Sequence, residues 1–377
     1  MARGKVLFVA TVYTHLAAFH LPFMKLLQEW GYEVHAAASP AEGRKEEVAA
    51  ATGAVCHDVP FARSFASPAH VPALRALLAL FNRERYALIH VHTPAAAWLG
   101  RLAARLARQG PVLYTAHGFH FYRGAPAWYW LAYYTLERLA ARWTDGLVVM
   151  NEEDYRAAQR MGFVPGRNLF LVHGVGVEVE RYANAAPASR EELGLHAGAK
   201  VAVCVGEFTA NKNHLLLLLA WREVVREVPE ARLLLVGAGA LRERVQFWVR
   251  EMGLAESVRL LGFRRDVPDL LALADVLTLT SKREGLPRAV MEAMAAGKPV
   301  VATDVRGSRD LVRHGENGFL VPPDDPGVLA RCLITLLRDP ALARKMGERG
   351  REMVKPCTLE NVRREMAEVY RKFLSAG

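Results

Sequence analysis

Cysteine is scarce in this sequence and long apolar runs are missing, and each shortage excludes a class of protein. The 377 residues include 4 cysteines, far apart and without a C-x-x-C pair, which argues against a disulfide framework and a cysteine-based zinc site. No apolar run reaches the roughly 18 residues needed to span a bilayer. The first residues, MARGKVLFVATVY, contain too short an apolar run for a signal peptide. We therefore expect a cytoplasmic protein, in a reducing compartment, whose contact with a membrane is at most peripheral.

The chain also lacks the usual signs of a metal site and of a nicotinamide site. No carboxylate pair at D-x-D spacing follows a strand pattern, and His90 and His92, two apart on one strand, have no recognisable third ligand. The turn GAGA after Val236 lacks the third glycine of a dinucleotide fingerprint. We therefore expect no metal site and no bound cofactor, and we interpret the GAGA turn as a plain strand-to-helix turn.

Basic residues outnumber acidic ones, but they are not gathered into a block. With 49 lysines and arginines against 39 aspartates and glutamates, the net charge is +10. Scattered arginines are not typical of a nucleic-acid-binding tail, so no nucleic-acid partner is expected. Nucleotide phosphates and an anionic membrane surface stay open as acidic partners.

Short apolar strand patterns alternate with helical patterns along almost the whole chain. A first series runs from KVLFVATV to NLFLVHGV, and a second runs from KVAVCVGE to GFLVP. Such alternation predicts two α/β domains, each with a parallel sheet covered by helices on both faces. The pattern lapses between residues 178 and 195, which we interpret as a linker. We expect domains over residues 1–180 and 181–355, and a last helix over residues 356–377 that packs back on the first domain.

The stretch over residues 277–310 predicts strand, loop, helix, strand and loop. Glu284 falls in the first loop, beside Gly285 and Leu286, and Glu292 falls in a helix that begins near Pro287. Ligands of open parallel sheets bind beyond the carboxyl ends of the strands, so these residues should face one crevice. Carboxylates there can accept hydrogen bonds from the hydroxyl groups of a sugar or ribose. For Glu292 the alternative is a solvated or dipole-complementing glutamate.

Three further candidates follow predicted strands. Lys212 lies in GEFTANKNH, just before a helix, where its ammonium group and the helix N–H groups suit a diphosphate; the alternative is a solvated lysine. His117 ends a strand, where an imidazole can bind a ligand or take a proton, or serve only the structure. His15 follows the first strand in a loop without glycine, which suits side-chain contact with an acceptor or a sugar better than a phosphate.

Two stretches suit contact with a membrane. Residues 70–86 form a helical pattern with a leucine face and a basic end, a pattern more typical of packing in the protein's own core. Residues 122–134, YRGAPAWYWLAYY, are dense in aromatic residues. Tryptophan and tyrosine favour the lipid headgroup interface, so this second stretch suits either the core or a membrane surface.

Together these motifs resemble the retaining glycosyltransferases of family 4, whose GT-B fold has two Rossmann-like domains facing across a cleft. The likeness rests on the E-x7-E pair Glu284 and Glu292 within EGLPRAVMEAMAAGKPVVATD, with GEFTANKNH ahead of it and GENGFLVPPDD behind. The segments YTAHGFHFYRGAP, NEEDY and VRGSRDLV are similar to the branch that builds bacterial exopolysaccharide and capsule repeat units.

The resemblance implies that a sugar is transferred, with retention at the anomeric carbon, from a nucleotide-sugar in the second domain to an acceptor in the first. Glu284 would bind hydroxyl groups of the donor sugar, Glu292 the ribose diol and Lys212 the diphosphate, assisted by the N–H groups of Gly285 and Leu286. No metal would be required.

The resemblance also implies that His117 contacts the transferred sugar or its developing positive charge. The base would be read through backbone atoms at a strand end formed by Gly262, Phe263 and Arg264. Many family members carry an arginine where this chain has Glu207, so neutralisation of the diphosphate would depend more on Lys212 and on helix N-termini. The glycine-rich first loop of many members is replaced by THLAAF.

We therefore expect a bacterial glycosyltransferase, peripheral on the inner face of the cell membrane. It would add a sugar from a UDP-sugar, with N-acetylhexosamine the first candidate, to a polyprenyl-diphosphate-linked saccharide. One alternative is an enzyme of the same architecture that acts on the nucleotide-sugar itself, as an epimerase or hydrolase. Another is a non-catalytic protein that binds a sugar nucleotide or a polysaccharide.

Overall fold

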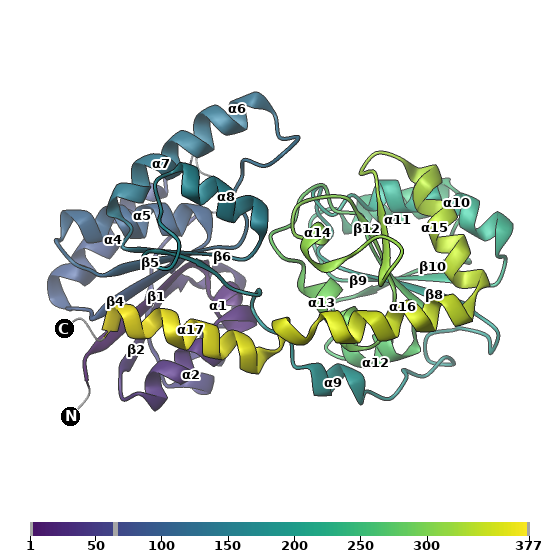
Figure 1. Ribbon diagram of the computed structural model, residues 1–377, viewed down its shortest axis with the longest axis horizontal. Helices are drawn as coiled ribbons and strands as arrows, with labels where there is room; N and C mark the ends of the chain where they lie inside the picture. Colours follow the sequence, from purple (N-terminus) through teal and green to yellow (C-terminus); the bar gives the residue numbers. More distant parts are fainter. Residues whose placement is uncertain (1–2, 63–66, 375–377) are drawn as a thin grey trace. The chain divides into compact units, whose positions relative to one another are not determined.

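The computed structural model describes residues 3–62 and 67–374 and divides the chain into two compact units (Figure 1). Unit 1 comprises residues 1–175 and 360–377, and unit 2 comprises residues 176–359. The sequence-based boundaries, at residues 180 and 355, lie close to these points. Residues 1–2 and 375–377, which the expected first and last segments include, lie outside the described residues.

Unit 1 contains a seven-stranded parallel sheet in the order β3-β2-β1-β4-β5-β6-β7. Its strands are β1 (Lys5–Val12), β2 (Glu33–Ser39), β3 (Val55–Asp58), β4 (Leu88–His92), β5 (Val112–Ala116), β6 (Gly146–Val149) and β7 (Leu169–Leu171). The central strands β1, β4 and β5 are buried over almost their whole length, as expected for a parallel sheet covered on both faces.

Side chains of β1 alternate between two hydrophobic cores. Leu7 and Val9 belong to one core, whereas Val6 and Phe8 belong to the other, as the two-residue period of a strand requires. The helices of unit 1 are α1 (Tyr13–Phe19), α2 (Leu21–Glu29), α3 (Lys45–Thr52), α4 (His70–Arg83), α5 (Pro94–Leu106), α6 (Ala127–Tyr129), α7 (Thr135–Ala140), α8 (Glu152–Arg160) and α17 (Leu359–Leu374). A π-helix, Trp130–Tyr134, joins α6 to α7.

Two of these helices show how the cores are closed. Helix α4 buries Leu77 and Phe81 in the first core, so the leucine face of residues 70–86 packs inside unit 1. Helix α17 buries Met366 and Tyr370 in the second core, and the Tyr370 hydroxyl lies 3.0 Å from Nδ1 of His90. The last helix therefore packs on unit 1.

Unit 2 contains a six-stranded parallel sheet in the order β10-β9-β8-β11-β12-β13. Its strands are β8 (Lys200–Val205), β9 (Ala231–Val236), β10 (Val258–Gly262), β11 (Val276–Leu279), β12 (Val300–Thr303) and β13 (Gly318–Val321). Its helices are α9 (Val179–Ala183), α10 (His214–Glu227), α11 (Arg242–Glu251), α12 (Val267–Leu273), α13 (Arg288–Ala295), α14 (Ser308–Leu311), α15 (Pro326–Arg338) and α16 (Pro340–Met353). The expected α/β class with two parallel sheets is confirmed. Helix α9 lies in the stretch interpreted as a linker.

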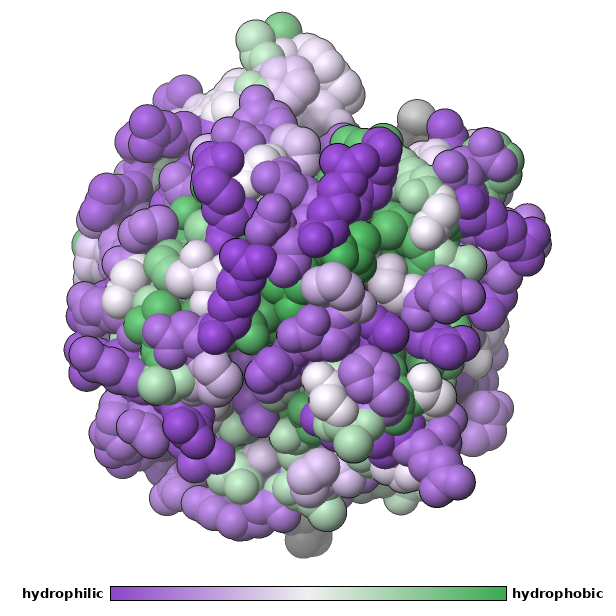
Figure 2. Space-filling view, turned by 90° about the vertical axis from the view of Figure 1, so that its right-hand side faces the viewer, coloured by the Kyte–Doolittle hydropathy of each residue, from purple (hydrophilic) through white to green (hydrophobic). Residues whose placement is uncertain are grey.

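The face shown in Figure 2 carries mainly hydrophilic residues, with hydrophobic residues visible in small areas between them. Within residues 3–62 and 67–374, no helix combines the length and the apolarity needed to cross a membrane.

Candidate active site

Lys212 and Glu284 meet at the carboxyl edge of the sheet of unit 2. Lys212 lies in the loop after β8 and Glu284 in the loop after β11, and these two strands are paired neighbours. Lys212 Nζ lies 2.5 Å from Glu284 Oε1, and the two side chains are 21% and 12% exposed. The loops therefore place an ammonium group and a carboxylate together where a parallel sheet usually binds its ligand.

The two loops are tied to each other by further hydrogen bonds. The N–H of Lys282 donates to the Asn211 carbonyl at 2.8 Å, and the Asn211 side chain donates to the Arg283 carbonyl at 3.1 Å. The Thr280 hydroxyl donates to the Lys212 carbonyl at 3.0 Å. These bonds fix the backbone on both sides of the Lys212–Glu284 pair.

The GAGA turn after β9 packs directly on the loop after β8. A Cβ atom at Gly237 would lie 2.0 Å from the Gly206 carbonyl oxygen, and Gly237 has a φ of +149° that disfavours other residues. Its N–H donates to the Gly262 carbonyl at 2.8 Å. The glycines of this turn are therefore needed for close approach between the three loops that follow β8, β9 and β10.

The loop after β12 supports Glu284 from the other side. Arg306 is 4% exposed, and its Nε donates to the Glu284 carbonyl at 2.9 Å. A Cβ atom at Gly307 would lie 2.1 Å from the Gly285 carbonyl oxygen, so this position also requires glycine. Arg306 carries no assignment in the sequence analysis, although it lies in the quoted segment VRGSRDLV.

Glu292 lies on α13 and is held by two donors. Its Oε1 accepts hydrogen bonds from the Tyr182 hydroxyl at 2.7 Å and from Arg288 Nε at 2.9 Å. Glu292 is buried, with 7% of its surface exposed. Burial raises the pKa of Glu292, while Arg288 and the Tyr182 hydroxyl act in the opposite direction. The carboxylate is thus oriented before any ligand binds.

Tyr182 is a residue that the sequence analysis missed. It lies on α9, within the stretch interpreted as a linker, and burial raises the pKa of its hydroxyl. The aromatic residue inside an alanine-rich and charged stretch is the signal that could have pointed to it. Its hydrogen bond to Glu292 makes α9 part of the site.

The other predicted donor-binding residues are more dispersed. Gly285 and Leu286 are half-buried between Glu284 and α13, and Glu207 is exposed in the loop after β8. Phe263 is 70% exposed, and Arg264 forms an ion pair with Asp266. These two residues follow β10 at the edge of the sheet, where β8 and β9 separate them from β11.

His117 and His15 lie together at the carboxyl edge of the sheet of unit 1. His117 follows β5 and His15 lies on α1, and their Nε2 atoms are 3.3 Å apart. His20 Nε2 lies 3.2 Å from His15 Nε2, and the His92 ring stacks on the His20 ring with centroids 3.7 Å apart. We call His15, His20, His92 and His117 the histidine cluster.

The histidine cluster differs from the expectation that the histidines form no ligand constellation. One ring nitrogen of each of its four members lies within 4.8 Å of the others. His92 belongs to it, whereas His90 is bound to Thr115 and Tyr370, as a structural histidine would be. Burial lowers the pKa of His20 and His92 well below the usual value and lowers that of His117 to about 4. These three imidazoles are therefore neutral at pH 7.

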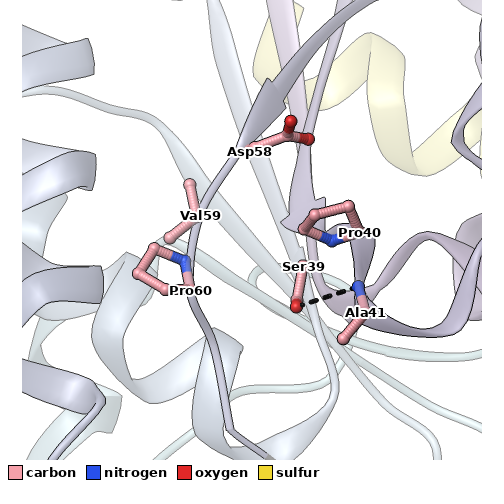
Figure 3. A pocket seen from close by; sticks show the side chains of 6 residues that line it. All are labelled: Ser39, Pro40, Ala41, Asp58, Val59 and Pro60. Atoms are coloured by element: carbon pink, nitrogen blue, oxygen red, sulfur yellow. Dashed lines mark hydrogen bonds between the residues drawn. The ribbon is translucent and has the colours of Figure 1, made fainter.

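A cavity opens at the same edge of the sheet of unit 1 (Figure 3). Its volume is about 400 Å³, and it is lined by Ser39, Pro40, Ala41, Asp58, Val59 and Pro60, at the ends of β2 and β3. The Asp58 carboxylate accepts a hydrogen bond from Lys45 at 2.7 Å. The short 3₁₀ helix Pro40–Glu42, which follows β2, is joined to α1 by a hydrogen bond of 3.1 Å from the Thr14 hydroxyl to the Glu42 carbonyl. The cavity therefore lies beside the helix that carries His15.

The aromatic stretch over residues 122–134 is partly core and partly surface. The Trp130 and Tyr134 rings pack against Phe121, a buried residue of the first core. Trp128 and Leu131 are 58% and 77% exposed. One side of this stretch therefore anchors it to unit 1, and the other presents apolar side chains at the surface.

Comparison with family models finds two matches that together cover most of the chain. The model described as "Glycosyltransferase Family 4" matches residues 23–181, and the model described as "Glycosyl transferases group 1" matches residues 186–353. The first match lies almost entirely in unit 1 and the second lies in unit 2.

Two curated relatives match over most of their own length. EpsD of Bacillus subtilis (strain 168), provisionally named a glycosyltransferase, is 38% identical over 98% of this chain and 97% of its own. The Escherichia coli enzyme named UDP-Gal:alpha-D-GlcNAc-diphosphoundecaprenol alpha-1,3-galactosyltransferase is 30% identical over 72% of this chain and 71% of its own.

Solved structures give the same fold. HepE from Anabaena, in complex with UDP and glucose, superposes with a TM-score of 0.79 at 22% identity, over 97% of this chain and 99% of its own. Sucrose-phosphate synthase from Thermosynechococcus elongatus superposes with a TM-score of 0.78 at 22% identity, over 99% of this chain and all of its own (100%). The fold expected from the sequence is confirmed.

Proposed function

This chain belongs to glycosyltransferase family 4, with the GT-B fold, and on that basis we propose that it transfers a sugar from a UDP-sugar to a polyprenyl-diphosphate-linked saccharide. The transfer retains the anomeric configuration and needs no metal. It serves the synthesis of exopolysaccharide or capsule, and N-acetylhexosamine is the first donor sugar to test.

The observation that carries the proposal is the pair formed by Lys212 and Glu284. When the donor binds, its diphosphate takes the Lys212 ammonium group, and the hydroxyl groups of its sugar donate to the Glu284 carboxylate. Lys212 thus exchanges a carboxylate for another anion, the diphosphate, and Glu284 exchanges an N–H donor for neutral O–H donors. The fixed cation takes the part that a metal ion plays in other phosphate sites, which supports transfer without a metal.

Glu292 is proposed to bind the ribose diol. Tyr182 and Arg288 both bind Oε1, so the carboxylate is held in one orientation on α13. A preoriented acceptor of hydrogen bonds loses little conformational entropy when a diol binds. The N–H groups of Gly285 and Leu286, between the two glutamates in sequence, are proposed to bind a phosphate or the sugar.

His117 is proposed to contact the transferred sugar from unit 1. A neutral imidazole can exchange hydrogen bonds with a hydroxyl group or face a developing positive charge without repelling it. The cavity beside α1, with Asp58 on its wall, is a candidate place for the hydroxyl groups of the acceptor.

Similar proteins support the choice of donor and acceptor. The name of the Escherichia coli relative gives UDP-Gal as its donor and a GlcNAc-diphosphoundecaprenol as its acceptor. HepE has also been solved with UDP-glucose, at a TM-score of 0.77. A relative from Bacillus anthracis, 34% identical over 44% of this chain, is named N-acetyl-alpha-D-glucosaminyl L-malate synthase.

A lipid-linked acceptor requires that the protein reach a membrane surface. Trp128 and Leu131 are exposed, and Arg123 lies in the same aromatic stretch. An exposed tryptophan and a basic residue in one stretch suit the headgroup region of an anionic bilayer. We therefore propose peripheral binding at the cytoplasmic face of the cell membrane.

A thermal-shift screen of UDP-, GDP- and ADP-sugars tests the donor. A ligand that binds only the folded protein raises the melting temperature by mass action, so a UDP-sugar should give the largest shift. A larger shift with a GDP- or ADP-sugar would contradict the choice of UDP.

Incubation of each sugar nucleotide without acceptor, followed by NMR, tests the epimerase or hydrolase alternative, which predicts conversion under those conditions.

A further inference from the structure

The histidine cluster gathers ring nitrogens from three neighbouring strands of unit 1. His15 and His20 follow β1, His92 ends β4 and His117 follows β5, and these strands are adjacent in the sheet. The cluster therefore lies at the carboxyl edge of the sheet, at the point between β1 and β4 where the strand order changes direction. A ring nitrogen of each histidine lies within 4.8 Å of the others.

Two of the separations match those of ligands around one ion. Nitrogen ligands about 2.0–2.1 Å from a tetrahedral Zn²⁺ lie about 3.3 Å from one another. The Nε2 atoms of His15 and His117 are 3.3 Å apart, and those of His20 and His15 are 3.2 Å apart. The fourth nitrogen, from His92, lies within 4.8 Å of the other three.

Hydrogen bonds between the rings do not account for the arrangement. His15 Nε2 faces two other Nε2 atoms, of His20 and His117. A ring nitrogen of a neutral imidazole carries either one proton or one lone pair, so it cannot make a full hydrogen bond to both neighbours. A cation between the three lone pairs would satisfy all of them together.

His92 supplies an independent reason to expect a ligand. The residue is 0% exposed, and neither of its ring nitrogens has a hydrogen-bond partner in the described part of the chain. Nδ1 of His20, which is 2% exposed, is in the same state. A buried nitrogen without a partner destabilises the folded chain, so buried nitrogens are usually hydrogen-bonded or bound to a ligand.

We propose that the histidine cluster is a binding site for one divalent transition-metal ion, with Zn²⁺ as the representative ion. One ring nitrogen each of His15, His20, His92 and His117 binds the ion. Imidazole nitrogens suit Zn²⁺, Co²⁺, Ni²⁺ and Cu²⁺, whereas Mg²⁺ and Ca²⁺ require oxygen ligands. The four members offer nitrogen alone, so the site selects against the ions that usually accompany phosphates.

Binding of the ion does not depend on the proposed function. Its effect on transfer does, because the ion would occupy the same His117 side chain that is proposed to face the transferred sugar. Loading with Zn²⁺ should then slow a transfer that itself needs no metal. Binding and activity are therefore measured separately.

The experiment uses the full chain without an affinity tag, freed of metal with EDTA and dialysed. Co²⁺ is titrated and followed by visible absorption, which is intense for tetrahedral coordination, and Zn²⁺ is then titrated against a chromogenic chelator. We expect one equivalent of either ion per chain. Six-coordinate Co²⁺ spectra, or no saturable binding at micromolar concentrations, would overturn the proposal.

Two ligand variants and a matched control make the test specific. His15→Asn and His117→Asn each remove one ligand from a half-buried position, and each should weaken Zn²⁺ binding by at least about 100-fold. His196→Asn removes an exposed histidine of unit 2 and should bind Zn²⁺ as the native chain does. Circular dichroism checks that each variant is folded. If only one of the two ligand variants folds, that variant alone is enough to test the proposal. Native affinity in a folded His15→Asn or His117→Asn variant would show that the ion binds elsewhere.

Discussion

The candidate sites of the two units differ in how their polar groups are balanced before a ligand binds. In unit 2, positive and negative side chains are already paired, Lys212 with Glu284 and Arg288 with Glu292. In unit 1, the same edge of the sheet carries imidazoles, three of which are kept neutral by burial. A paired site can exchange its partners for a charged diphosphate and a diol. A neutral site suits a sugar or a single cation.

Replacing Lys212, the cation of the paired site in unit 2, should have the largest effect on activity. A small effect would contradict the contrast drawn between the two sites. Lys212→Met leaves Glu284 without its partner and the diphosphate without neutralisation, so kcat/KM should fall by about 1000-fold. The measurement is UDP release with donor and acceptor present. Lys345→Met, which removes an exposed lysine of α16, should leave the rate unchanged. Equal rates for the two variants would mean that Lys212 does not bind the diphosphate.

Changing the neutral site should affect the reaction rather than donor binding. His117→Asn should lower kcat by roughly 100-fold, because an imidazole near the transferred sugar contributes mainly to the transition state. The dissociation constant for UDP, measured by calorimetry, should stay within about 2-fold of the native value, since UDP is proposed to bind unit 2. A large loss of UDP affinity would show that the two sites do not have separate tasks.

Two tyrosine variants sharpen the contrast between the units. Tyr182→Phe removes one hydrogen bond from the buried Glu292 and should weaken UDP binding by about 10-fold, a cost typical of a bond to a charged group. Tyr370→Phe removes the matching bond to His90 in unit 1 and should lower the melting temperature without changing UDP affinity. Calorimetry and thermal melting are done on both variants. Equal UDP affinities in the Tyr182→Phe and Tyr370→Phe variants would contradict the assignment of Glu292 to the ribose.

Acid should destabilise unit 2 through one histidine outside the site, and this prediction has the smallest expected effect on activity. His214 is 3% exposed, and burial lowers its pKa to about 4, with Lys212 acting in the same direction. Between pH 6.5 and pH 4 the unfolded chain binds a proton at this residue and the folded chain does not, so stability falls as the pH falls through this window.

From pH 7 to pH 5 this loss amounts to about 2 kcal/mol. Thermal melting at pH 7 and pH 5 should show a smaller drop in melting temperature for His214→Gln than for the native chain. An equal drop in both would mean that His214 titrates normally in the folded state.

The paired site was accessible to prediction from sequence, and the neutral cluster was not. Lys212 and Glu284 each follow a buried apolar strand, so local patterns place both at the carboxyl edge of one sheet. The family resemblance assigns both residues to one donor. The four histidines lie at positions 15, 20, 92 and 117, and they meet because β1, β4 and β5 are neighbours. Strand order is set by long-range packing, which no local pattern encodes.

Tyr182 and Gly237 illustrate the same limit at single positions. Tyr182 lies in a stretch whose composition predicts a linker, and only the packing of α9 against α13 brings it to Glu292. The sequence predicts a plain turn at Gly237, and the structure adds that its lack of a side chain allows close approach to the Gly206 carbonyl. Both roles depend on contacts between segments that are distant in sequence.

The central claim is tested most directly by UDP release from the full chain in detergent, with EDTA present. UDP-N-acetylhexosamines, UDP-glucose and UDP-galactose are each supplied with and without a polyprenyl-diphosphate-linked saccharide. The account predicts UDP release that requires the acceptor, persists in EDTA and is lost in Lys212→Met. No release from any UDP-sugar with lipid-linked acceptors present, or release that does not depend on the acceptor, would contradict it.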